Sequence, residues 1–240
     1  MGNEVRRLGL ICGKGFERVG YGGDIGVIIE ADQDDYHGRT TSAEELPVEH
    51  EASFGGARSV LYIRRWGPEH RANGTSRRND YGKVDYGKIE GILRASSITD
   101  VVSTSTTVSY SRDISEGSLV VPEYFLIDSK AVEFDPVLRS LLLEAGNVRV
   151  LDTGSYIKYK GSKNRVRRKN VLVGSSVPRE YELARRLGAR YACLAVVTRN
   201  RKTGKDLEKS EITELTRVAA DVMSGFVSKF TGRTVRQEKQ

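Results

Sequence analysis

Residues 178–197, PREYELARRLGARYACLAVV, decide the fold class because a helix and a buried strand follow one another directly. Residues 178–187 are expected to be helical, and Gly188 suits the position just past a helix end. Residues 191–197 are almost wholly apolar and predict a buried strand. A helix that leads straight into such a strand is typical of α/β proteins.

The same alternation continues on both sides of this stretch. Apolar and β-branched runs predict strands over residues 5–12, 59–65, 99–110 and 118–127, the last a pair or a single strand bent at Pro122. Helical spacing of apolar residues predicts helices over residues 86–97, 135–145 and from Ser210 to Phe226. We therefore expect one α/β domain over residues 1–232, with a mixed central sheet flanked by helices, and a basic polar tail over residues 233–240.

The composition points to a basic protein without membrane or metal-binding signals. Lys and Arg number 39 against 32 Asp and Glu, a formal charge of +7 that favours polyanionic partners. Cys12 and Cys193 each lie in an apolar run and are expected to be buried thiols, while His37 and His50 lack metal-ligand spacing. With no apolar run of membrane length and no signal peptide, we expect a cytoplasmic location. The high charged fraction also fits a thermophilic source.

Residues 154–169, GSYIKYKGSKNRVRRK, carry seven Lys and Arg, two Tyr and no acid. Residues 148–159 alternate as a strand does, residues 161–164 resemble a turn, and the chain returns toward residues 171–173. This pattern predicts a basic hairpin suited to a phosphate backbone. A solvated charged surface is the simpler alternative.

Other basic segments extend the predicted nucleic-acid interface beyond this hairpin. Its candidate contacts are Lys158, Lys160, Lys163, Arg165, Arg167, Arg168, Lys169, Arg199, Arg201, Lys202, Arg77 and Arg78. No recognition-helix motif for duplex DNA is visible, and loops with aromatic residues suit structured RNA. The expected partner is therefore RNA or a ribosomal subunit.

Several segments, taken in order, resemble the purine nucleoside phosphorylases, most closely the methylthioadenosine phosphorylase branch. These segments are LGLICGKGF (8–16), IRRWGPEH (63–70), VDYGKIEGIL (84–93), VVSTSTTVSYSRDISEGSLVVPEYF (101–125), GSSVPREYELARRLG (174–188) and YACLAVVTRN (191–200). The resemblance covers roughly residues 8–227. It implies a single-domain nucleoside-phosphorylase-like fold and an assembly of three or six subunits. It also implies a residual phosphate pocket made by Lys14, Arg65, Ser105 and Ser175.

The chain departs from the family pattern at positions that catalysis would require. Lys14 stands where the family has a phosphate-binding Ser or Thr, and Gly174 replaces a Met under the ribose. Arg199 lies where the resemblance implies a purine-facing acid, and Lys169 where it implies a ribose-binding Glu. Residues 125–136 cross a gap that the family fills with a long active-site segment.

Two main functions are compatible with these observations. The first is a non-catalytic phosphorylase-fold protein that binds structured RNA or ribosomal particles through the basic hairpin, without a cofactor. The alternative is a diverged purine nucleoside or methylthioadenosine phosphorylase that transfers a pentosyl group to inorganic phosphate. A third hypothesis is a regulatory partner of an active paralogue.

Overall fold

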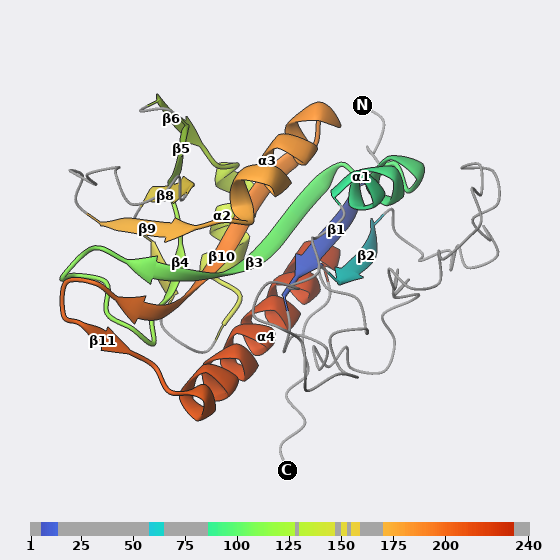
Figure 1. The fold of residues 1–240 in the computed structure, drawn as a ribbon. Coiled ribbons are helices and arrows are strands. Elements are labelled where there is room, and N and C mark those ends of the chain that lie inside the picture. The colour runs from blue at the N-terminus through green and yellow to red at the C-terminus, as the bar shows by residue number, and fades with distance from the viewer. Residues whose placement is uncertain are drawn as a thin grey trace, which may run out of the picture.

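A computed structural model describes residues 6–13, 58–64, 86–127, 130–146, 150–152, 155–158 and 170–232. For residues 155–158 it describes the backbone alone. The helices are α1 (Tyr86–Ala95), α2 (Pro136–Leu143), α3 (Val177–Arg186) and α4 (Lys209–Thr231) (Figure 1). The strands are β1 (Arg6–Cys12), β2 (Arg58–Arg64), β3 (Asp100–Ser109), β4 (Leu119–Val121), β5 (Tyr124–Ile127), β6 (Lys130–Glu133), β7 (Val150–Asp152), β8 (Ser155–Lys158), β9 (Val171–Gly174), β10 (Arg190–Asn200) and β11 (Lys205–Asp206).

All described strands belong to one mixed sheet, in the order β6-β5-β8-β9-β3-β10-β4-β7. Strand β1 pairs with β2 and β3 beside this path, and β11 pairs with β10. The centre of the sheet is the long parallel ladder of β3 and β10, from Arg190 opposite Asp100 to Asn200 opposite Ser109. The mixed α/β fold expected from the sequence is confirmed.

Helices cover both faces of the sheet because β10 is apolar on both sides. Ala192, Leu194 and Val196 contribute to a core cluster with α2 and α4, which includes Leu138 and Phe226. The intervening residues of β10, Tyr191, Cys193, Ala195 and Val197, face a second cluster with α1 and α3. Strands buried on both faces form continuous apolar runs, which explains why residues 191–197 are almost wholly apolar.

The ends of the helices follow the expected capping chemistry. The Asp135 carboxylate accepts a hydrogen bond from the Leu138 amide at 2.9 Å, and Pro136 occupies the first turn of α2. Helix α3 ends before Gly188, whose φ of +69° favours glycine. Helix α4 begins with a reciprocal capping box between Glu208 and Glu211. Cys12 and Cys193 are buried free thiols, as expected.

The predicted basic hairpin is wrong in its topology. Residues 150–152 and 155–158 are two strands with different partners, because β7 pairs with β4 whereas β8 pairs with β5 and β9. Strands β8 and β9 are parallel, with Ser155 opposite Val171 and Lys158 opposite Gly174. Parallel neighbours need a crossover connection rather than a tight turn. Residues 159–169 themselves lie outside the described part of the chain.

The segment after residues 191–197 forms a hairpin. Strand β10 runs to Asn200, and the chain returns through a turn into β11. Asn200 and Lys205, and Arg199 and Asp206, are the paired residues of this hairpin. Within the described residues, no helix is long and apolar enough to cross a membrane.

Candidate anion-binding site

The sheet opens at the middle of β3. On one side β3 pairs with β10 along its length, but on the other side it has two different neighbours. Strand β1 runs parallel to the first half, up to Ile11 opposite Ser103, and β9 runs antiparallel to the last residues, up to Val173 opposite Val108. The carboxyl ends of β1 and β9 therefore approach residues 104–107 from opposite directions. Ligands of open α/β sheets bind where neighbouring strand connections diverge in this way.

Hydroxyl groups and main-chain amides lie around this junction, with Thr104 and Ser105 on opposite faces of β3. We call it the β3 site: Gly13, Thr104, Ser105, Ser175 and Ser176. The Gly13 amide donates to the Thr104 hydroxyl at 3.3 Å. The hydroxyls of Ser105 and Ser176 lie 3.0 Å apart, although they belong to β3 and to the residue before α3. Each hydroxyl can donate one hydrogen bond and accept two, so both can reorient toward a bound anion.

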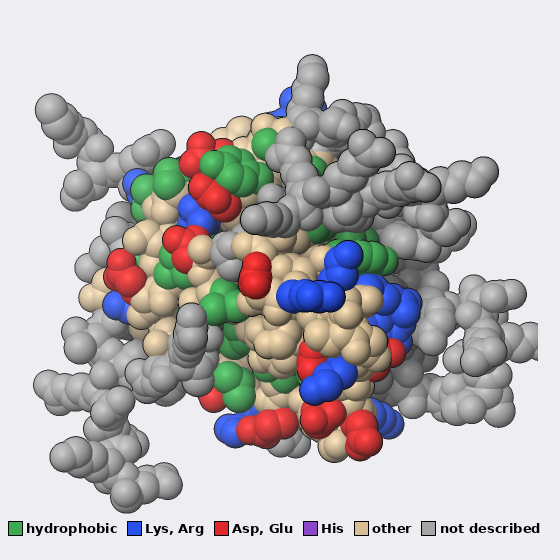
Figure 2. All heavy atoms as spheres, turned by 90° about the vertical axis from the view of Figure 1, so that its left-hand side faces the viewer, with side chains coloured by type: hydrophobic (Ala, Val, Ile, Leu, Met, Phe, Trp, Pro, Cys, Tyr) green, Lys and Arg blue, Asp and Glu red, His purple; other side chains and the backbone are tan. Residues whose placement is uncertain are grey.

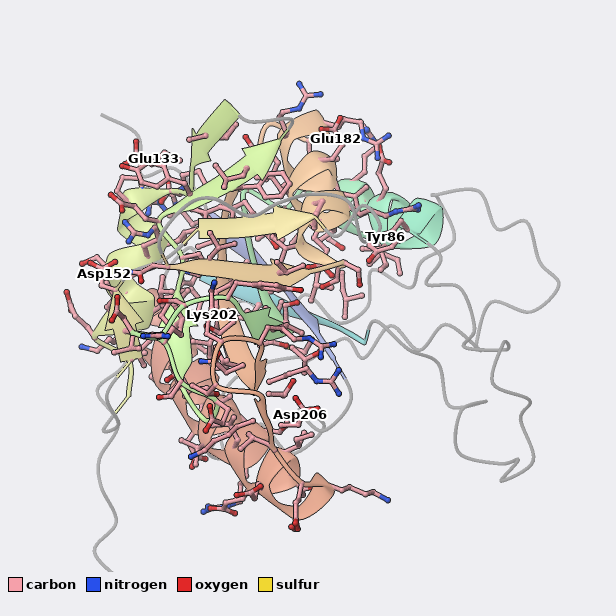
Figure 3. The ribbon with its side chains drawn as sticks, turned by 60° about the vertical axis from the view of Figure 1, so that its left-hand side comes forward. Tyr86, Glu133, Asp152, Glu182, Lys202 and Asp206 are labelled. Atoms are coloured by element: carbon pink, nitrogen blue, oxygen red, sulfur yellow. The ribbon has the colours of Figure 1, made fainter. Side chains whose placement is uncertain are left out.

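Helix α3 adds a favourable field to these hydroxyls. Ser176 is its N-cap residue, so the first amides of the helix face the same region as the Ser176 hydroxyl. The positive end of a helix dipole stabilises an anion by about 0.3–1 kcal/mol when the site is exposed. The Arg179 guanidinium on the first turn lies over the Tyr86 ring, 5.4 Å from its centroid. Figure 3 shows Tyr86 at the start of α1, next to α3.

A buried polar group holds α3 against the sheet beneath the site. The Tyr191 hydroxyl of β10 is 2.6 Å from the Ser103 hydroxyl and donates to the Glu180 carboxylate at 3.3 Å. Ser103 and Glu180 are fully buried. Since buried polar groups must keep their partners, these contacts fix the position of α3 relative to β3 and hence of Ser176 relative to Ser105.

The predicted phosphate residues are placed only in part. Ser105 lies in the site and is 4% exposed. Ser175 is exposed, and its neighbour Ser176 makes the contact with Ser105. Lys14 and Arg65 lie outside the described residues; in the sequence they directly follow Gly13 and the last residue of β2.

The predicted cation at the end of β10, Arg199, has an acidic partner. Arg199 forms an ion pair with Asp206 of β11 at 2.8 Å, and both side chains are about half exposed. Arg201 and Lys202 are exposed in the turn that follows. Lys158 ends β8, where the backbone alone is described. The remaining predicted contacts lie outside the described residues: Lys160, Lys163, Arg165, Arg167, Arg168, Lys169, Arg77 and Arg78.

Sequence reasoning missed two residues that connect segments near the ends of β3 and β10. Ser176 could have been found from Pro178, since a proline in the first helical turn places the N-cap one or two residues earlier. Asn200 carried no such signal. Its fully buried side chain donates to the carbonyls of Ser111 and Ile114, both at 2.9 Å, and accepts from the amides of Lys202 and Thr203.

Solved structures of other proteins have a similar architecture. A substituted adenosine/methylthioadenosine phosphorylase from Schistosoma mansoni, in complex with methylthioadenosine, superimposes with a TM-score of 0.63 at 18% identity, covering 95% of this chain and 93% of that one. A doubly substituted form of the same enzyme in complex with adenine gives a TM-score of 0.64 at 17% identity, with the same coverage. This chain has the nucleoside phosphorylase fold. The fold inferred from the resemblance is thereby confirmed.

The structure identifies the phosphorylase fold, whereas searches with the sequence against family models and curated proteins do not. No family model matches the chain, and no curated protein matches it. Among the described residues, no group of three or more His, Cys, Asp or Glu side chains could hold a metal ion.

Proposed function

We propose that the β3 site binds inorganic phosphate together with a purine nucleoside, and that the protein is a diverged nucleoside phosphorylase. The observation that carries the proposal is the contact between the Ser105 and Ser176 hydroxyls at the N-terminus of α3. Two hydroxyls, helix amides and the end of β1 form an arrangement suited to a phosphate. It occurs in the fold of enzymes whose structures contain methylthioadenosine or adenine.

In this proposal the protein positions phosphate for transfer of the pentosyl group. A phosphate oxygen forms a bond to the anomeric carbon while the bond from that carbon to the purine nitrogen breaks, and the purine leaves with the electron pair and then takes up a proton. Ser105, Ser176 and the α3 amides hold the phosphate near the sugar. Lys14 and Arg65 follow Gly13 and β2 directly in the sequence, and they would supply positive charge to the same anion.

The ion pair at the end of β10 weakens one argument against catalysis. A guanidinium alone would oppose the positive charge that develops on the sugar. Asp206 lies 2.8 Å from Arg199 and offsets much of that charge. The argument against catalysis that rests on Arg199 is therefore weaker in the folded protein than in the sequence.

The first prediction tests the two hydroxyls. Purified protein is assayed for release of purine base from adenosine, inosine, guanosine and methylthioadenosine, with and without phosphate. We expect phosphate-dependent release from at least one nucleoside. Replacing either Ser105 or Ser176 by Ala should raise the KM for phosphate by about tenfold or more, because each hydrogen bond to an anion contributes about 1.5–3 kcal/mol.

Ser224→Ala is the matched control, because this serine of α4 donates only to its own helix, to the Ala220 carbonyl at 3.0 Å. Its KM for phosphate should stay at the wild-type value. The proposal fails if no nucleoside is cleaved and phosphate does not raise the melting temperature of the wild-type protein.

A further inference from the structure

Three segments that are distant in the sequence meet at Ser111, just after β3. The Ser111 carbonyl accepts from Asn200 at 2.9 Å, and its hydroxyl donates to the Asn170 side chain at 2.8 Å. The Arg201 amide donates to the Ser109 carbonyl at 2.9 Å. The end of β3, the start of β9 and the turn after β10 are therefore joined at one end of these neighbouring strands (Figure 1).

Exposed cations surround this junction. We use the term Ser111 corner for the surface formed by Arg112, Arg201 and Lys202, all of which are exposed. Among the described residues, none of the three forms an ion pair, whereas Arg199 and Lys205 nearby are paired with Asp206 and Glu116. Asp113 is the acidic neighbour in the sequence, so the corner keeps a net positive charge.

The figures agree with this distribution of charge. Figure 2 faces these strand ends and shows a group of Lys and Arg side chains right of its centre, with Asp and Glu side chains beside it and, mixed with further Lys and Arg, along the lower margin. Figure 3 shows Lys202 at the turn after β10, and Asp206 on the strand that returns from it. The cations at the turn are thus separated from the paired charges of the hairpin.

The most basic stretch of the sequence joins the fold at the same corner. Residues 158–169 contain seven Lys and Arg and no acid, and they end one residue before Asn170. Asn170, with a φ of +54°, begins the return into β9 and bonds to Ser111. The other end of this stretch, Lys158, lies opposite Gly174 in the sheet. Lys158 therefore lies beside the strand that leads into Ser175 and Ser176, and Asn170 lies beside Ser111.

We propose that the Ser111 corner binds RNA through its phosphate backbone. Turns and strand ends that carry unpaired cations suit an irregular strand, and the half-buried Tyr110 beside Arg112 offers a ring for stacking. Duplex DNA is usually read by a helix or ribbon inserted in the major groove, and this corner is made of turns. The inference is independent of the β3 site, because it uses none of that site's residues.

The test compares two double variants that remove the same charge. Arg201→Ala with Lys202→Ala changes the corner, and Arg185→Ala with Arg217→Ala changes two exposed arginines on α3 and α4. The probe is a fluorescein-labelled single-stranded RNA of mixed sequence, about 20 nucleotides long, titrated between about 50 and 200 mM KCl. Competitors are a DNA duplex of the same sequence and vesicles that contain phosphatidylserine.

The corner variant should bind RNA about 25-fold more weakly at about 0.1 M salt, and its salt slope should fall by about 1.4, because each lost phosphate contact removes about 0.7 from the slope. The control variant should bind within about twofold of wild type. Arg201→Lys with Lys202→Arg keeps the charge and should restore most of the affinity.

Three results would overturn the proposal. Wild-type protein that binds no RNA at about 50 mM KCl excludes it, since backbone binding is strongest at low salt. An equal loss in the control variant would mean that net charge alone attracts RNA. Stronger binding to the DNA duplex or to the vesicles would assign the corner to another polyanion.

Discussion

At the scale of single residues, Gly225 is the glycine with least room for a side chain among those that the structure describes. A Cβ atom there would lie 1.9 Å from the Ala145 carbonyl oxygen and 2.9 Å from its carbon. Both are backbone atoms, so no rotamer change can relieve the overlap. The close approach of α4 to the chain after α2 thus depends on the absence of one methyl group.

We therefore expect Gly225→Ala to lower the free energy of unfolding by about 1–3 kcal/mol or more, as overpacked cores do. Gly91→Ala in α1 is the control, since its Cβ would meet nothing within 4 Å. That change should stabilise the protein by about 0.5–1 kcal/mol, because alanine is the better helix former. Urea unfolding measures both, and equal effects of the two changes would contradict the packing argument.

Residue patterns identified part of the candidate site. Ser105 was predicted from the resemblance, and its burial agrees with a place inside the fold. The resemblance assigned Ser175 to the phosphate pocket, whereas in the structure its neighbour Ser176 is the N-cap of α3 and contacts Ser105. Asn200 was not identified from the sequence, because its side chain donates to two carbonyls that lie 86 and 89 residues away in the chain.

At the scale of elements, an aromatic group joins α3 to the sheet. The Tyr181 ring lies 5.3 Å from that of Phe125 and 5.9 Å from that of Tyr191, measured between centroids. Burial raises the pKa of the Tyr181 phenol above its ordinary value of 10.0, and Glu182 raises it further, while Arg185 lowers it. The neutral phenol is therefore the form that the folded protein favours.

This shift predicts a loss of stability in alkaline solution. The unfolded chain ionises Tyr181 at a lower pH than the folded protein does, so the stabilisation is complete below about pH 10 and is lost as the pH rises through the folded pKa. Tyr181→Phe should make the free energy of unfolding fall less steeply between about pH 9.5 and 11. A difference between the two proteins that stays constant over this range would show that the phenol does not contribute.

Helices, which are determined by the residues of one segment, were predicted well. Strand pairing, which depends on a second segment, was predicted poorly. The helices α1, α3 and α4 lie within a few residues of the predicted ranges, because capping residues and apolar spacing are local. The basic hairpin failed because alternation identifies a strand but not its neighbour or direction. Strands β7 and β8 alternate alike, yet they pair with β4 and with β5 and β9.

At the scale of the whole molecule, the resemblance implies an assembly of three or six subunits. A trimer would have about three times the chain mass of 26.6 kDa, and sedimentation velocity distinguishes it from a monomer or a hexamer. Several copies of the Ser111 corner on one particle would increase RNA affinity through avidity. We therefore expect the assembled protein to bind long RNA more tightly than short RNA. Equal affinity for both lengths would indicate one corner acting alone.

The pairing of β3 with β10 also sets the order in which the molecule can fold during its synthesis. The centre of the sheet joins residues 100–109 to residues 190–200, and β1 and β2 are attached to the same ladder through β3. While the last third of the chain is still inside the ribosome, β3 therefore lacks the strand that lies along its full length. Contacts of such long sequence separation form slowly. The nascent chain must keep its apolar N-terminal strands from pairing with other chains until Asn200 emerges.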